Sequence, residues 1–475
     1  MPGVGGGRFK RQEVRRGRKR AFTPPPFPRI LPAMRVLVLA YDFPPYVSVG
    51  GLRPWSWYRY LGEFGVEPVV VTRQWENRYG DERDYVAPSA TRRVEVERSS
   101  WGTLVRTPYR PNLANRILLT HGPDRFALLR RAVSGVHVVT QYYLPTGPKS
   151  GLYHGARGYL RQHPVDAIVA TGDPYVLFWY ASLLSREFGI PWVADFRDPW
   201  SQDQARFREG FAKRWAERVE RRTVATAAAV TTVDVSFRDG LVGLHRDKRV
   251  EVIPNGYDPE ALQAAEDVEQ DPDTFTLAFA GTVSPWHPME SVCRVLDDFV
   301  RSDPALPFRF HLVGVVRGAA WEETLRTGFP ALAERTTFTP RLPNPEAARV
   351  LARAHALLLF NMYAHTGTKI YDYLALRRHV LLCYADDPES EALRARHYNV
   401  ATAPGADDRI VESMVRQARA GTVVKDAPHL RRVLGELGAE FRAKGALDCP
   451  SVDVEGYSRR AQAGRLAELL REVAR

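Results

Sequence analysis

The sequence AHALLLFNMYAHTGTKIYDYLAL, residues 354–376, passes from an unbroken apolar run into a helical pattern. The apolar run is short and does not alternate with polar residues, which predicts a parallel strand buried on both faces. Thr366, Gly367 and Thr368 then fit a tight turn and a helix N-cap, and the glycine lets another molecule approach the backbone closely. Helical spacing begins at Lys369. The stretch therefore predicts a strand–turn–helix unit, the repeating unit of a doubly wound parallel sheet.

The helix that starts at Lys369 carries a charged pair. Lys369 and Asp372 lie three residues apart, so both are on one helical face. A helix N-terminus attracts a diphosphate, and Lys369 would add a charge-assisted hydrogen bond worth about 1.5–3 kcal/mol. Asp372, one turn further, would accept hydrogen bonds from the two hydroxyls of a ribose. The competing interpretation is a solvated Lys–Asp pair that contributes about 0.2–0.5 kcal/mol. The surrounding sequence decides between them.

The charge of the chain is concentrated at its start. The 475 residues carry a formal net charge of +12 and 44% hydrophobic residues, as expected for a globular protein of about two or three domains. Residues 1–33 hold nine Lys or Arg against Glu13 alone, so this tail supplies +8 and leaves +4 for the rest. The nearly balanced body argues against nucleic acid as a partner.

Residues 1–33 are rich in Gly, Arg and Pro and have too few apolar residues to form a core, which predicts a disordered tail. They also lack the apolar segment of a secretion signal. The first predicted strand follows at once in MRVLVLAYDFPP, and we expect Met34 to be the natural start. If the tail is present, it is a basic arm suited to anionic lipid, which leaves peripheral membrane association open.

Cys293, Cys383 and Cys449 are widely spaced and suggest neither a metal motif nor a disulfide framework. No run of about 18 apolar residues is present, so no membrane-spanning helix is predicted. We expect a cytoplasmic protein, with the inner face of the membrane as the alternative location.

From Met34 onward strand and helix patterns alternate, which predicts an α/β protein. The turn at 254–256 and the acidic stretch EDVEQDPD mark the best domain boundary. Residues 101–164 break the pattern, and we expect irregular helices there. The predicted units are the tail (1–33), a first domain (34–248), a second domain (249–457) and a last helix (458–475) that packs back on the first domain. Two such domains imply a cleft at the C-terminal ends of their strands.

Six short motifs occur in the order and spacing of one known family. They are Gly50-Gly51, ADFRDPWS (194–201), VIPNGYD (252–258), FAGT (279–282), HLVG (311–314) and TKIYDYLA (368–375). Together they resemble a family 4 glycosyltransferase of the GT-B fold, in which two Rossmann-like domains face each other across a cleft. The resemblance covers residues 34–475. The spacing of Lys369 three residues before Asp372 resembles a subgroup of this family, the glycosyltransferases of surface-polysaccharide assembly.

The resemblance implies that the second domain binds a nucleoside-diphosphate sugar. Asp372 matches the second of the family's two glutamates, which implies ribose binding, whereas Ala364 stands where the first would be. Gly367 matches the glycine between them. Residues 365–368, with Thr366 and Thr368 among them, would supply backbone N–H groups to the donor.

The family's usual Arg and Lys after the first strand of the second domain are missing. Thr282 and His287 stand in their region, beside Gly281 of the FAGT motif. The resemblance implies that Lys369 and Arg341 compensate for the missing charges. A lone loop histidine such as His287 is also commonly incidental, so that alternative stays open.

In the first domain, Gly50 and Gly51 would let the backbone approach the donor phosphate or the acceptor, or they are simply a structural turn. Arg197 and Asp198 end a buried strand and would orient the acceptor hydroxyl or stabilise the leaving phosphate; a charged pair that caps the strand is the alternative. Asp195 alternates with Arg197 and should share its face. We predict Arg197, Asp198 and Lys369 as the catalytic residues.

The prediction is a retaining, metal-independent hexosyl- or related glycosyltransferase that acts on a glycan or lipid-linked glycan acceptor in cell-surface polysaccharide or glycoconjugate synthesis. A nucleotide sugar would be its donor substrate, and no cofactor is expected. One alternative is a sugar-nucleotide epimerase on the same fold. Another is a catalytically silent sugar-nucleotide-binding partner, suggested by Ala364 and Thr282.

Overall fold

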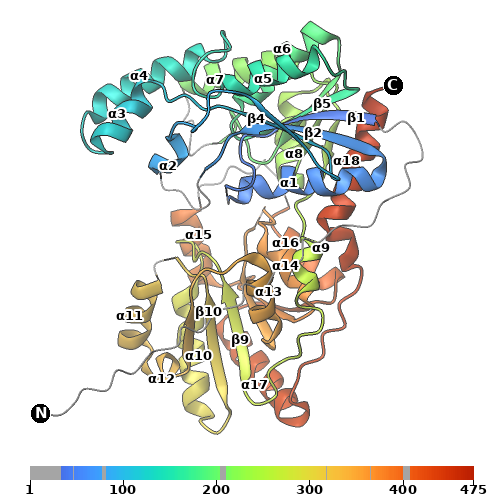
Figure 1. Ribbon diagram of the computed structural model, residues 1–475. Helices are drawn as coiled ribbons and strands as arrows, with labels where there is room; N and C mark the ends of the chain where they lie inside the picture. Colours follow the sequence, from blue (N-terminus) through green and yellow to red (C-terminus); the bar gives the residue numbers. More distant parts are fainter. Residues whose placement is uncertain are drawn as a thin grey trace, which may run out of the picture. The chain divides into compact units, whose positions relative to one another are not determined.

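The computed structural model describes residues 34–475 apart from 47, 77–81, 204–209, 317, 364 and 399–406. The predicted disordered tail, residues 1–33, lies outside the described residues. Within the described part, two sheets follow each other along the chain, each flanked by helices (Figure 1).

The first sheet has eight strands in the order β3-β4-β2-β1-β5-β6-β7-β8. All neighbouring strands are parallel except β3 and β4, which are antiparallel. The strands are β1 (Met34–Leu39), β2 (Val66–Arg73), β3 (Glu95–Arg98), β4 (Thr103–Thr107), β5 (Ala167–Gly172), β6 (Trp192–Phe196), β7 (Ala229–Thr232) and β8 (Val250–Val252). Their connecting helices are α1 (Val49–Tyr60), the 3₁₀ turn η1 (Leu61–Phe64), α2 (Glu82–Val86), α3 (Leu113–His121), α4 (Ala127–Thr140), α5 (Ser150–Leu160), α6 (Val176–Phe188), α7 (Phe211–Val224) and α8 (Val235–Leu244).

Strand β1 shows why strands of the first sheet are unbroken apolar runs in the sequence. Val36 and Val38 pack on one face in a core cluster that also contains residues of α1 and of the last helix of the chain. Leu37 and Leu39 pack on the other face in a second cluster, with residues of α5 and α6. Because both faces are covered, successive side chains are all apolar.

Two stretches of the first sheet differ from the sequence prediction. β8 pairs with β7, so the sheet extends to Val252, past the predicted boundary at 248/249, because the Pro254 turn follows this strand. β4 pairs with β2 inside residues 101–164, where only irregular helices were expected. Gly102 and Pro108 flank that five-residue strand and hide it in the sequence, whereas pairing with β2 stabilises it.

The second sheet has six strands in the order β11-β10-β9-β12-β13-β14, all parallel. The strands are β9 (Phe275–Ala280), β10 (Phe308–Val313), β11 (Thr336–Thr339), β12 (Ala356–Phe360), β13 (His379–Cys383) and β14 (Gly421–Val424). The helices of this part are α9 (Pro259–Gln263), α10 (Met289–Ser302), α11 (Gly318–Gly328), α12 (Pro330–Ala333), α13 (Asn344–Ala352), α14 (Lys369–Leu376), α15 (Pro388–His397), α16 (Ile410–Gln417) and α17 (Ala427–Lys444). The predicted strand–turn–helix at 354–376 is therefore β12, its loop and α14.

The chain then returns to the first sheet. After the 3₁₀ turn η2 (Val454–Tyr457), helix α18 (Arg459–Val473) begins with Ser458 as its N-cap, whose hydroxyl accepts from the backbone N–H of Ala461. Leu466 and Leu470 are fully buried in the cluster that contains β1 and α1. The last helix thus packs on the first domain, as predicted.

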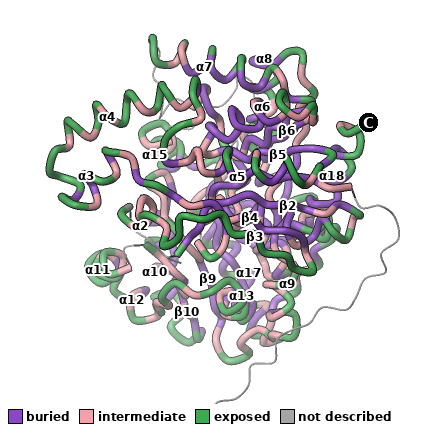
Figure 2. Tube along the Cα trace, turned by 45° about the horizontal axis from the view of Figure 1, so that its top comes forward, coloured by how far each residue is buried: buried purple, intermediate pink, exposed green. Residues whose placement is uncertain are grey.

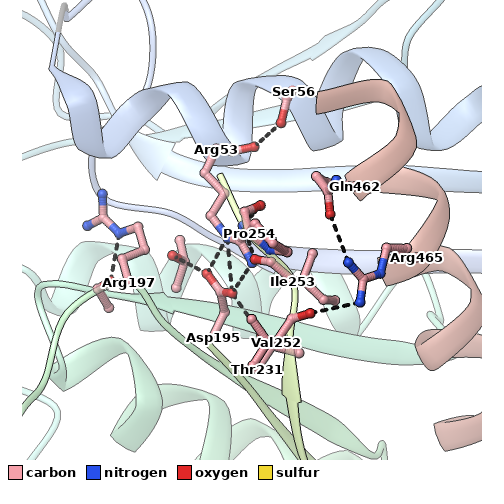
Figure 3. A network of polar contacts seen from close by, with 12 residues as sticks. Arg53, Ser56, Asp195, Arg197, Thr231, Val252, Ile253, Pro254, Gln462 and Arg465 are labelled. Atoms are coloured by element: carbon pink, nitrogen blue, oxygen red, sulfur yellow. Dashed lines mark hydrogen bonds and ion pairs between the residues drawn. The ribbon is translucent and has the colours of Figure 1, made fainter. Parts of the chain in front are cut away.

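A buried ion pair joins α1 to the first sheet near the predicted site residue Arg197 (Figure 3). Arg53 of α1 donates to Asp195 of β6, with 2.8 Å between Nη2 and Oδ1. The hydroxyls of Thr171 and Thr231 donate to the same carboxylate at 2.8 and 2.7 Å. Arg53 also donates to the carbonyl oxygen of Ile253, at 2.9 Å, just after β8. The charge is therefore paired and hydrogen-bonded on every side, as burial requires.

We expect Asp195→Ala to lower the free energy of unfolding by about 3–5 kcal/mol, because it leaves Arg53 buried without a counter-charge. Replacing both partners by apolar residues, Arg53→Met with Asp195→Leu, should recover most of that loss. Denaturant unfolding of both variants measures this. A loss below about 1 kcal/mol in the single variant would mean that the pair does not hold the structure.

Candidate functional site

The backbone of the loop between β12 and α14 is open to close approach by another molecule. Asn361 follows β12, and its side-chain oxygen accepts from the backbone N–H of Tyr363 at 2.8 Å. Gly367 has a φ of +62°, a left-handed conformation in which a side chain would be strained. Helix α14 begins two residues later at Lys369, with Thr368 in the N-cap position and no side-chain cap. Its first backbone N–H groups are therefore left for another acceptor. Ala364, where the resemblance lacks an acid, lies outside the described residues.

Lys369 lies against the end of β9. Its Nζ donates to the carbonyl oxygen of Thr282 at 3.0 Å and lies 4.3 Å from the ring centroid of Phe279. Gly281, with a φ of +84°, has no side chain, and this leaves space for the Lys369 side chain. A Cβ at Gly281 would lie only 3.1 Å from the Lys369 Cε. Burial lowers the pKa of Lys369 to about 8. Because no carboxylate among the described residues forms a salt bridge with it, Lys369 is a cation suited to an outside anion.

His287 lies near this lysine and is buried. Its Nδ1 accepts from the backbone N–H of Ser284 at 3.1 Å, and its ring stacks on Phe360. Burial, and secondly the Lys369 charge, lowers the pKa of His287 to about 3, so the ring is neutral. With Nδ1 as acceptor, the proton is on Nε2, and Nε2 has no hydrogen-bond partner within the described ranges. It is therefore a donor that awaits an acceptor.

Asp372 is half-buried one turn into α14. Burial raises the pKa of its carboxyl to about 6, with the Arg459 charge acting in the opposite direction. Its side chain accepts no hydrogen bond from the rest of the described chain. Thr368 lines a small pocket of about 20 Å³ together with Arg53, Asn255 and Arg459. That pocket has room for roughly one water molecule.

A second pocket, of about 90 Å³, lies beyond the ends of β12 and β13. It is lined by acidic and basic side chains, among them Asp387, Arg394 and Glu412. Glu412 is buried and accepts from the Asn361 amide at 3.3 Å. None of the predicted site residues lines this pocket.

Asp234 reaches the loop from the first sheet, and sequence analysis missed it. It follows β7, and its Oδ1 accepts from the Thr366 hydroxyl at 2.7 Å. Tyr371 of α14 donates to the same hydroxyl at 3.0 Å, and His365 Nδ1 lies 3.9 Å from the carboxylate. Burial raises the pKa of Asp234 to about 6, although the hydrogen bonds from Thr366 lower it; the Asp198 charge raises it further. The hydroxyl of Thr366, a predicted donor-binding residue, is thus already bonded to the Asp234 carboxylate.

The predicted residues of the first domain gather at the C-terminal ends of β1, β5 and β6. Arg197 donates from Nε to the carbonyl oxygen of Gly172 at 2.6 Å, and from Nη2 to that of Asp173. A side chain at Gly50 would displace the Arg197 guanidinium, since a Cβ would lie 2.1 Å from Arg197 Nη1. Asp42, which sequence analysis missed, is also beside Gly50 and accepts from Ser48 at 3.0 Å. Burial raises the pKa of Asp42, and the Arg197 charge opposes that rise.

The remaining predicted residues are placed as follows. Gly51 lies in the first turn of α1, and its N–H donates to the hydroxyl of the N-cap residue Ser48 at 3.0 Å. Asp198 is exposed, and its carbonyl oxygen accepts from the Tyr175 hydroxyl at 2.7 Å. Arg341 follows β11, with its Cα 3.5 Å from where a Cβ of Gly314 would be. No contact among the described residues joins Arg197 to Lys369. The structure therefore forms two groups, one on each sheet.

Sequence signals for the missed residues exist. Asp42 lies three residues after β1 and Asp234 two residues after β7, in LVLAYD and AVTTVD. At these ends of parallel strands side chains commonly meet a ligand. Asp195 and Arg197 were expected on one face; Asp195 turns to Arg53, and Arg197 turns to the neighbouring strand end (Figure 3).

Two doubly wound parallel sheets with polar groups at their strand ends define a protein of the GT-B fold. Residues 51–256 match the family described as glycosyl transferase 4-like domain. That segment runs from α1 to the turn after β8, within the first part of the chain. No curated protein sequence matches the chain significantly.

Solved structures show the same fold at low identity. An α,α-trehalose-phosphate synthase (UDP-forming) from Burkholderia xenovorans has a TM-score of 0.58 at 12% identity, over 92% of this chain and 100% of that one. A sucrose-phosphate synthase from Thermosynechococcus elongatus has a TM-score of 0.57 at 13% identity, over 92% and 98%. Anabaena HepE in complex with UDP has a TM-score of 0.53 at 13% identity, over 92% and 100%. These likenesses establish the architecture of both domains.

We expect Asp234→Asn to become increasingly more stable than the wild type as pH rises from about 4 to about 6. The folded carboxyl keeps its proton up to a pKa of about 6, whereas the unfolded one loses it near 3.8. The wild type therefore loses, as pH rises through the folded pKa, the stability that the neutral carboxyl provides below pH 4. The difference between the folded and unfolded pKa values of Asp234 corresponds to about 3 kcal/mol.

Denaturant unfolding at pH 4 and pH 7 measures this difference. Asp273→Asn, at an exposed position, is the control and should differ from the wild type equally at both values. An Asp234→Asn difference that does not change with pH would contradict the burial of this carboxyl.

Proposed function

We propose that the protein is a retaining glycosyltransferase that moves a hexose or related sugar from a nucleoside-diphosphate donor to a hydroxyl of a glycan or lipid-linked glycan, in the synthesis of cell-surface polysaccharide or glycoconjugates. The observation that carries this proposal is the Lys369 ammonium at the start of α14, which has no carboxylate partner among the described residues and lies close to the Nε2–H of His287. A cation, a neutral donor and free helix N–H groups together suit a diphosphate.

In the proposed donor subsite, different residues of the second domain contact different parts of the nucleotide sugar. Lys369 and the first N–H groups of α14 neutralise the diphosphate, Gly367 allows its approach, and Asp372 accepts from the ribose hydroxyls. His287 donates to a phosphate or sugar oxygen. Thr366 becomes available once Asp234 releases its hydroxyl. Thr282 and Gly281 contribute the backbone that seats Lys369.

The proposed acceptor side is the strand-end group of the first domain. Asp42 and Arg197 supply an acceptor and a donor of hydrogen bonds beside Gly50, which suits the hydroxyls of a sugar. In the retaining step the bond from the sugar's anomeric carbon to the donor phosphate breaks, and the acceptor oxygen bonds to the same face. The departing phosphate oxygen takes the acceptor's proton. The positive charge of Lys369 favours that departure without a resident cofactor or metal ion.

UDP is the first nucleotide to test, because the solved structures with this fold include one in complex with UDP and one named as UDP-forming. The pockets beside Thr368 and Asn361 are each far below the size of a nucleotide sugar, and we propose that the groups around Thr368 move apart when the donor binds. A panel of UDP-, GDP- and ADP-sugars, with release of free sugar as the readout, tests donor use. Binding without turnover of any of them would favour a silent sugar-nucleotide-binding protein.

We expect Lys369→Ala to lower kcat/KM roughly a hundredfold with the preferred donor, which corresponds to about 2–3 kcal/mol of lost charge-assisted bonding. The fold should be retained, because within the described chain the variant loses the bond to the Thr282 carbonyl and the contact with the Phe279 ring but leaves no carboxylate without its partner. Lys425→Ala, at an exposed site after β14, is the matched control and should keep full activity. Unchanged kinetics in Lys369→Ala would remove this residue from the site.

We also expect the dissociation constant for UDP to rise close to tenfold between pH 7.5 and pH 9 in the wild type. The pKa of Lys369 is about 8 because burial lowers it, so the cation that binds the phosphates is lost as pH rises through that value. Lys369→Arg keeps its charge throughout, and its affinity should stay nearly constant. Calorimetric titrations at several pH values compare the two proteins. Equal slopes would show that another group titrates.

A further inference from the structure

Helices α3 and α4 form a hairpin, residues 112–144, that is largely exposed at the edge of the first domain (Figure 2). We call it the outer hairpin. No residue of α4 is buried, although most of its side chains are apolar. Such a helix does not contribute to the core, and its apolar surface needs another explanation.

The apolar face of α4 points away from the protein. Leu128, Ala132, Val136 and Val139 repeat at helical spacing, and all four are exposed, with Leu128 at 80% and Val136 at 66%. The half-buried side of the same helix holds Ala127, Arg130, Val133 and His137. The helix is amphipathic, but its more polar side faces the protein. The apolar stripe is therefore available to an outside surface.

The outer hairpin is anchored at its base. Tyr142, directly after α4, is buried and stacks on Trp200 with 5.4 Å between ring centroids. Arg222 of α7 donates to the carbonyl oxygen of Tyr142 at 2.8 Å. At the other end, Asn115 of α3 donates to the buried Tyr109 at 2.7 Å. A fixed base holds the apolar stripe in one orientation.

The surroundings of the stripe are strongly basic. Residues 110–149 contain six Lys or Arg (Arg110, Arg116, Arg125, Arg130, Arg131 and Lys149) against Asp124 alone. Arg131, three residues after Leu128, is exposed beside the stripe, and Arg125 lies over the ring of the exposed Phe126. Apolar side chains flanked by cations match an anionic lipid surface, where the chains enter the headgroup boundary and the cations meet the phosphates.

A second copy of the chain is a poorer occupant. A twofold interface would place this basic face against itself, and the like charges would oppose it. In the described ranges no helix is long and apolar enough to cross a membrane, so the contact would be with one surface of the bilayer. We propose that the outer hairpin binds the surface of an anionic lipid bilayer, with the Leu128–Val139 stripe inserted and the flanking arginines on the headgroups. This assignment is independent of the proposed sugar transfer.

The test is sedimentation of the full chain with vesicles of phosphatidylcholine alone and of phosphatidylcholine with phosphatidylglycerol. The wild type should bind the anionic vesicles, less so at high salt, and the neutral ones much more weakly. Leu128→Glu with Val136→Glu should lower the partition coefficient roughly a hundredfold, because two apolar side chains are replaced by anions. Arg125→Gln with Arg131→Gln should weaken binding to anionic vesicles only.

Val242→Glu is the matched control, since Val242 is an exposed valine of α8 at 46% exposure outside the hairpin. It should bind like the wild type. All variants keep residues 1–33, so a contribution of the basic tail is common to them. Equal binding by Leu128→Glu/Val136→Glu and the wild type would overturn the proposal in favour of the tail. Absence of vesicle binding, with self-association that the same variant abolishes, would replace it by an interface between copies.

Discussion

The buried pair of Arg53 and Asp195 is the constraint on which the functional end of the first domain depends. Two charges in a dry interior are tolerated only when every polar atom finds a partner, and here two threonine hydroxyls and two backbone carbonyls complete the set. The pair links α1, the end of β6 and the passage after β8 in one hydrogen-bonded unit. Gly50, in the first turn of α1, and Arg197, just after β6, are close in the chain to these fixed points.

The loop before α14 combines charges that do not balance one another. Among the described residues Lys369 contacts the Thr282 carbonyl and the Phe279 ring but no carboxylate. His287 is neutral, with its proton on Nε2, which lacks an acceptor in the same part of the chain. Asp234, which reaches the loop from the first sheet, accepts from the Thr366 hydroxyl and forms no salt bridge with Lys369 among the described residues. The Lys369 ammonium and the His287 Nε2–H are therefore donors in excess of the acceptors that they contact in the described chain. Such an excess costs free energy in the empty protein and is recovered when an anion binds.

The two domains use similar architecture for different surfaces. The second sheet gathers cation and amide donors, whereas the first sheet gathers a mixed set around Asp42 and Arg197 and also bears the outer hairpin. A membrane surface on the first domain would suit an acceptor attached to a lipid. The proposed transfer and the proposed membrane contact are thus compatible, although each rests on its own residues.

The sequence by itself determined the alternation of strands and helices, the unit formed by β12 and α14, and the family resemblance, because these depend on local periodicity and short motifs. It also indicated Lys369, Gly281 and Thr282 as neighbours of one ligand. Only the tertiary structure decided that Lys369 reaches the Thr282 carbonyl, that Asp234 bonds Thr366, and that β4 and β8 complete the first sheet. It also decided that the apolar side of α4 faces outward. These outcomes depend on partners far away in the chain, and no local pattern records which distant group will satisfy a buried charge or cover an apolar face.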